Sequence, residues 1–454
     1  MKAFRTIRLA LLMIGLLSGG ARAAALSTQE GVREISQATV ITSPGAYLVT
    51  RDLLVLGGSA ITIQADDVTL DLNGHRIQSV PVFGTYDAAI RQQDWFANLS
   101  VFNGTVIGGA GAGIWATGRN SRVENVTVRG SQKGGILLGD MAVVENCIVV
   151  SNDLGLTGTN LICGGAGSRV AGSILIGNTG ARLVGIRGGQ GCIVDGCILR
   201  GNLASYYFNG VELARGGVVR SVSISDNYCA SSFSGVVADG TIERCAVVRN
   251  IKDMDGGSLA GIDAGVNGVV RRCIVKENTA YSGEAYAYFH RGHGGLFDCV
   301  AFSNVAVGAS AYGFCLSTNN TVASRCAATA NGSRGFYGPI GCIIKQSVAK
   351  WNGWYGIDVG AWSSVERCLV DNTGDATDTR TGIAANNGNV RVENNHVLDS
   401  GRGIGCFGGV NFLSGNSAVN TTNYVNTTGQ SCGAITNQPG ANFISYNPWQ
   451  NFGL

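Results

Sequence analysis

The segment Ser282–Gly295 holds the densest group of side chains that could do chemistry in this sequence. Within 14 residues it contains imidazole, guanidinium, carboxylate and phenol groups, carried by His290, His293, Arg291, Glu284 and Tyr286. Imidazoles transfer protons near neutral pH, and a guanidinium neutralises negative charge that develops during a reaction. Together with a carboxylate, such a cluster could abstract the proton next to a uronate carboxylate or protonate a glycosidic oxygen. The same composition is typical of a polar, solvated loop, so the interpretation depends on what lies beside the segment.

Aromatic and acidic residues give two further candidates. Trp351 and Trp354 lie with Tyr355 and Trp362 within 12 residues, and such rings could stack on sugars or simply pack at an edge. Asp253 and Asp255 precede Gly256 in an acidic turn whose oxygens would suit Ca²⁺, although the spacing matches no defined calcium loop. Cysteine and histidine spacing matches no zinc site.

An internal repeat defines the elements that must position these groups. Nine asparagines recur at intervals of 21 to 28 residues: Asn152, Asn178, Asn202, Asn227, Asn250, Asn278, Asn304, Asn331 and Asn352. Five residues before each lies a small, mostly apolar residue, and in six repeats it is cysteine: Cys147, Cys197, Cys245, Cys273, Cys299 and Cys326. Short alternating stretches such as Val143 to Val149 and Val269 to Val275 read as strands with one buried face.

A unit of this length with short strands, Gly-rich corners and no helical period cannot bury its apolar face alone. Stacked units bury it, and the sequence therefore predicts an all-β, parallel β-helix of about 12 to 13 coils. Counting back from Cys299 shows that Tyr288 is equivalent to Ile262 of the preceding coil, so both side chains should point inward. The outward neighbour of Ile262 is Asp263, which the repeat therefore places one coil from Arg291.

The two repeated residue types are expected to be structural. A stacked asparagine amide can bond its copies in the coils above and below and tolerates a left-handed backbone, so we expect an asparagine ladder. The cysteines of one register should stack as small inward hydrophobes with free thiols. Four of them fall in consecutive coils, within disulfide range, so a disulfide bond between neighbouring coils is an alternative to free thiols.

Composition limits the partners. The chain has 454 residues with 69 glycines, 5 prolines and 14% charged residues, which favours tight turns and argues against disorder or a coiled coil. The formal charge of +3 comes from basic residues at the amino terminus, and a near-neutral body argues against nucleic acid or an anionic membrane as the main partner. Lys2, Arg5 and Arg8 precede the apolar run Leu9 to Leu17, so residues 1–23 read as a secretory signal.

The segment Ile41 to Ile77, ITSPGAYLVTRDLLVLGGSAITIQADDVTLDLNGHRI, resembles the amino-terminal cap and first coils of secreted bacterial right-handed parallel β-helix proteins with a pectate-lyase-like fold. The repeats carry this resemblance through about Asn426. It implies the architecture, which is shared by polysaccharide lyases, polygalacturonases, uronate epimerases and non-enzymatic surface or tail proteins. Of the polygalacturonase motifs only Gly292-His293-Gly294 matches, and the Asp-Pro-His-Asp motif of alginate epimerases is missing.

These observations predict four parts: a signal peptide at 1–23, a cap with first coils at 24–84, the β-helix at 85–430 and a C-terminal cap at 431–454. We expect an exported protein, periplasmic, at the cell surface or extracellular, that binds a polysaccharide, with cleavage or epimerisation as the reactions its site would perform. The alternative is a non-catalytic surface or matrix rod. The expected catalytic residues are Asp263, His290, Arg291 and His293; the expected substrate-binding residues are Glu284, Tyr286, Arg271, Trp351 and Trp354.

Overall fold

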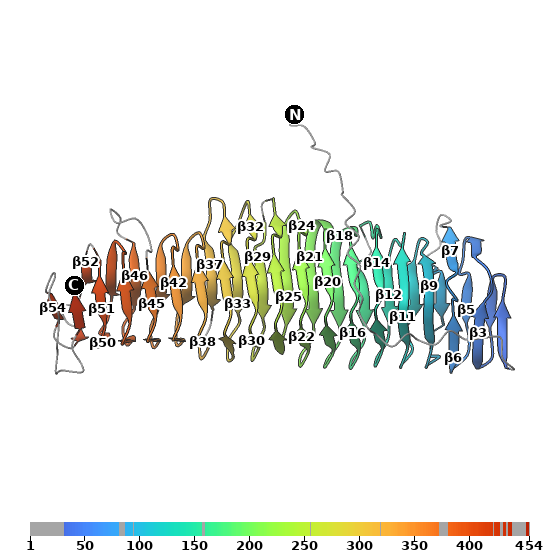
Figure 1. The fold of residues 1–454 in the computed structure, drawn as a ribbon, viewed down its shortest axis with the longest axis horizontal. Helices are drawn as coiled ribbons and strands as arrows, with labels where there is room; N and C mark the ends of the chain where they lie inside the picture. The colour runs from blue at the N-terminus through green and yellow to red at the C-terminus, as the bar shows by residue number, and fades with distance from the viewer. Residues whose placement is uncertain are drawn as a thin grey trace, which may run out of the picture.

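The computed structural model describes residues 31–80, 87–93, 95–156, 159–254, 256–317, 319–371, 380–420, 422–426, 430–432, 435–437 and 451–453. The predicted signal segment 1–23 lies outside these ranges, as does most of the predicted C-terminal cap. All regular structure in the described residues is β, and none of it forms a helix long and apolar enough to cross a membrane. The strands stack into one long rod, with the first strands at one end and the last at the other (Figure 1).

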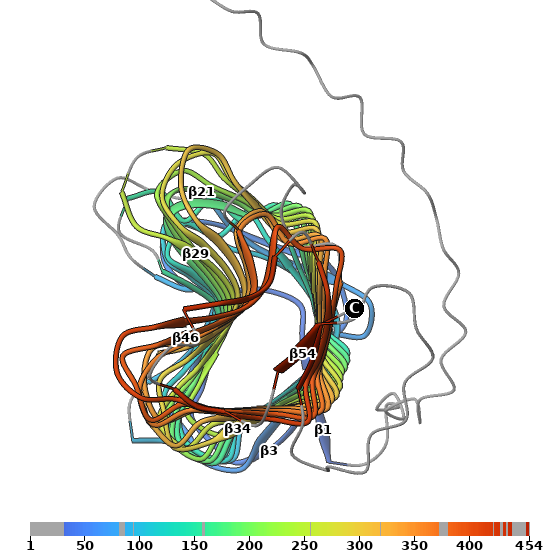
Figure 2. The same cartoon turned by 90° about the vertical axis from the view of Figure 1, so that its left-hand side faces the viewer.

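One coil shows how the chain is organised. Strand β30 (Val269–Arg271) is followed by β31 (Ile274–Lys276), the two-residue β32 (Thr279–Ala280) and β33 (Ala285–His290). Each strand pairs in parallel with its equivalent in the next coil, so the rod has three faces: the first built by strands equivalent to β30, the second by those equivalent to β31, and the third by those equivalent to β33. Seen end-on, the coils superpose around one central core (Figure 2). The predicted right-handed parallel β-helix is confirmed.

The third face carries the longest strands. From the amino-terminal side, its strands are β10 (Ala112–Ala116), β12 (Gly134–Leu138), β15 (Asn160–Gly164), β18 (Thr179–Gly188), β21 (Leu203–Leu213), β25 (Ser232–Ala238), β29 (Leu259–Ala264), β33, β37 (Ala311–Leu316), β40 (Arg334–Gly338), β43 (Tyr355–Val359), β46 (Thr381–Asn386) and β49 (Arg402–Phe407). The strands alternate between inward and outward side chains. In β29, for example, Ile262 is fully buried in the core while Asp263 points outward, as the repeat predicts.

The repeated glycine of the third face is required by close approach between coils. A Cβ atom at Gly210 would lie 2.5 Å from the carbonyl oxygen of Gly235, and one at Gly235 would lie 2.4 Å from that of Gly261. Real Cβ atoms do not come so near, so only glycine lets these coils stack at this point. This explains why a glycine precedes the inward residue in so many repeats.

The asparagine ladder is confirmed. Each asparagine from Asn152 to Asn331 is buried, and its Nδ2 donates to Oδ1 of the next one at 2.9 to 3.2 Å. The same Oδ1 also accepts the backbone N–H of the previous asparagine. The left-handed residue, however, is the one before each asparagine, such as Ser151 at φ 51° and Arg249 at φ 53°. The expectation that asparagine itself adopts this backbone is corrected: the chain reverses one residue earlier, which leaves the amide free to point inward.

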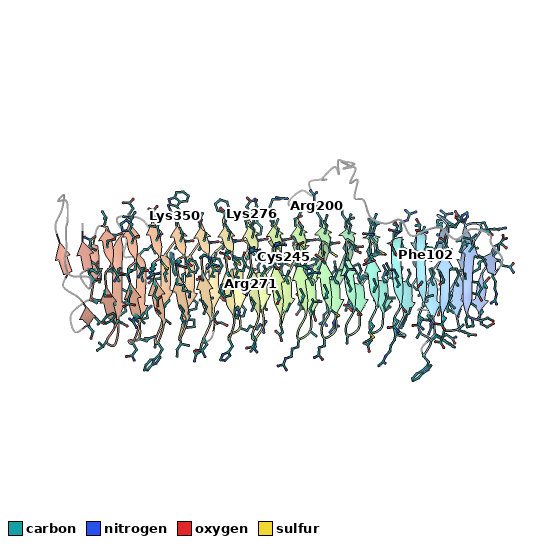
Figure 3. The ribbon with its side chains drawn as sticks, turned by 60° about the horizontal axis from the view of Figure 1, so that its bottom comes forward. Phe102, Arg200, Cys245, Arg271, Lys276 and Lys350 are labelled. Atoms are coloured by element: carbon teal, nitrogen blue, oxygen red, sulfur yellow. The ribbon has the colours of Figure 1, made fainter. Side chains whose placement is uncertain are left out.

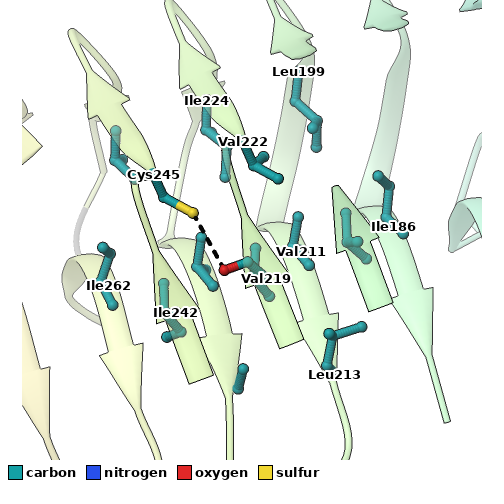
Figure 4. Close-up of a cluster of buried hydrophobic side chains, with 14 of the residues drawn as sticks. Ile186, Leu199, Val211, Leu213, Val219, Val222, Ile224, Ile242, Cys245 and Ile262 are labelled. Carbon is teal, nitrogen blue, oxygen red and sulfur yellow. Dashed lines mark hydrogen bonds between the residues drawn. The ribbon is translucent and has the colours of Figure 1, made fainter. Parts of the chain in front are cut away.

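The cysteines of the repeat form an inward column. All seven, including Cys368, are at most 2% exposed, and they are free thiols. The thiol of Cys245 donates to the carbonyl oxygen of Val219 in the preceding coil at 3.7 Å (Figure 4). Toward the C-terminal end the same register changes to asparagine, where Asn395 donates to Asn416 and Asn416 to Asn451, each at 3.0 Å.

The rod contains about 15 coils, slightly more than the 12 to 13 predicted. Strands in the amino-terminal region already stack in register: β2 (Thr39–Ile41) pairs with β5 (Ile61–Ile63), and β5 with β8 (Ile90–Gln92). At about 4.8 Å per coil, the rod is roughly 70 Å long.

Candidate functional site

A groove is hollowed into the third face. It has a volume of about 1300 Å³ and extends from β15 to β33, with Cys163 near one end and Tyr286, Phe289 and Arg291 near the other. These strands are separated by five inter-coil steps, so the groove is about 24 Å long. Its long axis follows the axis of the rod. We call this cavity the groove.

The hollow exists because the outward side chains of two coils are small. Ser234 in β25 and Ala260 in β29 occupy one outward row of the groove floor, and the next coil places Tyr286 in that row. Val237 occupies the neighbouring row, beside Asp263. Small floor residues between larger ones leave a depression that closes at Tyr286. All of these residues line the cavity.

A carboxylate–guanidinium pair lies at one side of the groove. Arg291 donates through Nε to Asp263 Oδ1 at 2.8 Å and through Nη2 to Oδ2 at 2.5 Å. The carboxylate raises the pKa of Arg291, and the bidentate geometry fixes both groups. The Asp263 side chain is 8% exposed and that of Arg291 is 55% exposed. The pair therefore presents a half-open guanidinium to the cavity, with Asp263 behind it.

A second carboxylate stands at the aromatic end. Glu284 accepts hydrogen bonds from the hydroxyls of Tyr286 and Tyr312, the latter at 3.5 Å, and the two tyrosine rings stack with centroids 5.1 Å apart. Burial and the nearby carboxylate raise the pKa of Tyr286 well above its ordinary value, so its hydroxyl stays protonated and remains a donor. Glu284 and Tyr286 both line the groove, as does Asp263.

The opposite end contains polar groups that the sequence reading missed. Glu212 lies 3.6 Å from Arg187 and accepts from Asn209 Nδ2 at 2.8 Å, while Nδ2 of Asn209 also contacts the Tyr207 hydroxyl. Asn209 is 3% exposed, and its Oδ1 has no hydrogen-bond partner. This oxygen is itself shielded from solvent, so Asn209 contributes to the wall by contacting Glu212 and Tyr207 through Nδ2. Counting the register back from Asp263 would have identified Glu212, which holds the equivalent place two coils earlier.

The wall beside Asp263 is held by a buried lysine. Lys252, in β28 (Ile251–Lys252), is 0% exposed, and its Nζ donates to the carbonyl oxygens of Met254 at 2.7 Å and Ser282 at 2.6 Å. It thereby ties the loop after β28 to the loop before β33. These two loops contribute Gly257, Ser258, Gly283 and Glu284 to the groove. Burying an ammonium group is costly, so its hydrogen bonds to two successive loops fix the shape of this wall.

His290 is inside the core and does not reach the groove. It follows Phe289 in a strand whose side chains alternate, with Tyr288 and His290 inward and Phe289 outward. Its Nε2 bonds the carbonyl oxygen of Gly268 at 2.8 Å, and its Nδ1 accepts the N–H of Gly292 at 3.0 Å. Burial lowers the pKa of His290 below its ordinary value. The neutral ring thus holds the turn that carries Arg291, which is a positioning role.

The remaining candidates lie elsewhere. His293 sits in the turn after Arg291 with φ of 51° and is not one of the groove residues. Arg271 is on the first face (Figure 3). Its guanidinium lies 5.5 Å from the Phe297 ring. Trp351 and Trp354 are 57% and 48% exposed at the corner before β43, and neither lines the groove. Sequence position alone cannot separate corners from faces, which is why these residues were grouped with the site.

The acidic turn is only partly described. Asp253 accepts a hydrogen bond from the Tyr228 hydroxyl at 2.6 Å, whereas Asp255 lies outside the described residues. Across the part of the chain that the structure describes, no group of three or more histidine, cysteine, aspartate or glutamate side chains is arranged to hold a metal ion.

Comparison with known proteins gives structural neighbours alone. No protein-family model matches the chain, and no curated protein matches its sequence. The mannuronan C-5 epimerase A-module of Azotobacter vinelandii is similar with 11% identity over 77% of this chain and 88% of that one, at a TM-score of 0.33. A tailspike protein of Escherichia coli bacteriophage HK620, solved as a double mutant with a pentasaccharide, matches with 12% identity. The match covers 80% of this chain and 72% of the tailspike chain, at a TM-score of 0.35. A surface adhesin of Streptococcus pneumoniae matches with 11% identity over 72% of this chain and 84% of the adhesin chain, at a TM-score of 0.24.

Proposed function

We propose that this protein binds an extended polysaccharide in the groove of the third face. The observation that carries the proposal is the groove itself, a cavity of about 1300 Å³ whose lining combines carboxylates, guanidinium groups and hydroxyls. Its length of about 24 Å along the rod suits a chain better than a small molecule. Hydroxyl-rich ligands are held by many hydrogen bonds of this kind at once.

The charges of the lining favour a neutral glycan. Four carboxylates line the groove, those of Glu212, Asp239, Asp263 and Glu284, against the two guanidinium groups of Arg187 and Arg291. Arg187 lies beside Glu212, Arg291 is paired with Asp263, and the Lys252 ammonium lies behind the wall, so one carboxylate remains in excess and leaves the groove negative. A uronate polymer would place further carboxylates in this field and be repelled. The groove therefore suits uncharged sugars and their hydroxyl groups.

Glycoside hydrolysis is a second candidate function, favoured by one observation. Asp263 and Glu284 both line the same stretch of the groove, one beside a guanidinium and the other beside phenol hydroxyls. Hydrolysis of a glycosidic bond uses two carboxyl groups in different settings. In this version Arg291 orients Asp263, and Asp263 and Glu284 divide the two roles of hydrolysis: one protonates the leaving glycosidic oxygen, while the other takes up the proton of the water that attacks the anomeric carbon. We further propose that the chain is exported, as its first 23 residues predict.

A groove-filling substitution tests the binding proposal. Ala260→Trp places a large ring on the groove floor, and Ala246→Trp does the same on the second face as a matched control. The protein is screened on a glycan array, and the best ligand is titrated by calorimetry. We expect binding of a neutral glycan that Ala260→Trp weakens by about 100-fold or more, while the control binds as wild type.

The same preparation tests turnover. Release of new reducing ends from the bound glycan, lost in Asp263→Asn and Glu284→Gln, would support hydrolysis. Binding of the glycan without release of reducing ends would show that the protein binds the glycan and does not hydrolyse it. A protein that binds no glycan on the array, or that binds equally well after Ala260→Trp, would overturn the groove as a polysaccharide site and favour the non-catalytic rod.

A further inference from the structure

A row of tyrosines continues from the end of the groove. Tyr286 in β33 pairs in register with Tyr312 in β37, Tyr312 with Arg334 in β40, and Arg334 with Tyr355 in β43. The neighbouring outward row adds Tyr337 beside Arg334. We call these five residues the tyrosine strip. Tyr286 belongs to both the groove and the strip, so the two surfaces are continuous.

The strip is rigid. The guanidinium carbon of Arg334 lies 5.2 to 5.4 Å from the ring centroids of Tyr312, Tyr337 and Tyr355. Arg334 also donates to the Tyr312 hydroxyl at 3.1 Å and, through Nε, to Asp358 at 2.7 Å. The other oxygen of Asp358 accepts from Asn386 at 2.7 Å. These contacts fix the tyrosine rings in place before any ligand arrives, which lowers the ordering cost of binding.

In the outward row that contains Tyr286, tyrosine is confined to these coils. In the row that contains Tyr286, the preceding coils carry Ser234 and Ala260, and the coil after Tyr355 carries Thr381. Stacking of the coils therefore does not require tyrosine at this position. Tyr286, Tyr337 and Tyr355 are also only partly buried, so ring surface remains open to a partner. The apolar face of a pyranose ring is a partner that such a ring surface accepts.

We infer that the tyrosine strip is a second set of glycan subsites, in which sugar rings of the chain held by the groove stack on Tyr286, Tyr337 and Tyr355. This inference rests on the proposed function. The combined surface runs from β15 to β43, eight inter-coil steps or about 38 Å. A short oligosaccharide fills the groove alone, whereas a long one reaches the strip.

A length series of the glycan selected on the array tests the inference. Wild-type protein is titrated with oligosaccharides of increasing length, together with Tyr337→Ala and Tyr355→Ala. The control is Phe297→Ala, which removes a ring stacked with Arg271 on the first face. We expect each tyrosine variant to bind short oligosaccharides as wild type does and long ones about 3- to 10-fold more weakly. Tyr337→Phe keeps the ring and should bind both as wild type does.

The outcomes separate the two proposals. If long oligosaccharides bind the alanine variants as tightly as wild type, or if short and long ligands lose affinity equally, the strip is not a subsite, although the groove still is. If wild-type protein binds no oligosaccharide of any length, the proposed function fails and the strip inference fails with it. Circular dichroism of each variant confirms the β-helix before titration.

Discussion

Two aspartate–arginine pairs, whose aspartates share one outward row of the third face, lie in very different settings. Asp263 is linked in register through Phe289, Cys315 and Tyr337 to Asp358, four coils and about 19 Å away. Asp263 pairs with an arginine that is 55% exposed, at the edge of an open cavity. Asp358 pairs with an arginine that is 19% exposed and enclosed by three tyrosine rings.

The difference shows that enclosure of the arginine, more than the identity of the pair, decides what each pair does. Both aspartates are nearly buried, but water and ligands reach the guanidinium of Arg291 and are largely kept from Arg334. Burial raises the pKa of Asp358 even though Arg334 opposes this shift. An enclosed pair is costly to form and very costly to break, whereas an open pair contributes little to stability and can take part in binding.

Replacing Asp358 and Asp263 in separate variants should give the largest difference in the free energy of unfolding. Asp358→Ala leaves the guanidinium of Arg334 enclosed without its counter-ion, so we expect a loss of about 3 to 5 kcal/mol in the free energy of unfolding. Asp263→Ala leaves Arg291 in contact with solvent, so we expect a loss below about 1 kcal/mol. Urea unfolding followed by circular dichroism measures both, with Asp358→Asn as the control that keeps the shape of the side chain. Equal losses in the two alanine variants would refute the role given to enclosure.

The region around Asp263 also has a loop wall that depends on one buried lysine. Lys252 ties together the loops beside Asp263 through the carbonyl oxygens of Met254 and Ser282. Lys252→Met removes those hydrogen bonds while keeping the buried stem, so the wall should loosen and the affinity for the glycan should fall about tenfold. Titration with a short oligosaccharide measures the effect, and Lys252→Arg should recover part of it. Unchanged affinity in the methionine variant would show that the wall does not depend on this lysine.

The sequence predicted different amounts of structure at the corners of the coils and on the third face. The asparagine ladder was readable because one residue type recurs at a nearly constant interval and makes the same contact in each coil, as Asn250 does with Asn278. Asp263 and Arg291 were placed on adjacent coils by counting from Cys299. The left-handed corner residues were not predicted, because Ser151, Arg249 and Glu277 share no chemistry that would mark them.

The groove could not be read from residue types alone. Its hollow depends on small outward residues such as Ser234 and Ala260, which carry no signature of binding, and on loop walls whose path follows from Lys252. His290 drew attention because histidine is often catalytic, yet strand alternation from the inward Tyr288 already places it in the core. Register was thus the more reliable guide to which side chains share a surface.

Acid should loosen the Asp263 region and spare the Asp358 region. The neutral His290 ring donates from Nε2 to Gly268 and accepts from Gly292 at Nδ1, and burial lowers its pKa from 6.5. The unfolded chain therefore takes up this proton at higher pH than the folded chain does. Stability from this group is full above about pH 6.5 and is lost as the pH falls toward the lowered pKa of the folded state. The Asp263 carboxylate is the charge that opposes this shift.

His290→Gln tests this sign, because an amide can donate to Gly268 without titrating. We expect wild-type protein to lose more stability than the variant between about pH 8 and about pH 5, measured by thermal unfolding. The three other histidines are present in both proteins and cancel in the comparison. The protection factor for hydrogen exchange, taken relative to the intrinsic rate at each pH, should fall in acid at the Gly292 amide, which donates to His290, and stay unchanged in β40, which carries Arg334. An equal loss of protection at both sites would mean that acid acts on the whole rod, and that the two pairs are not independently supported.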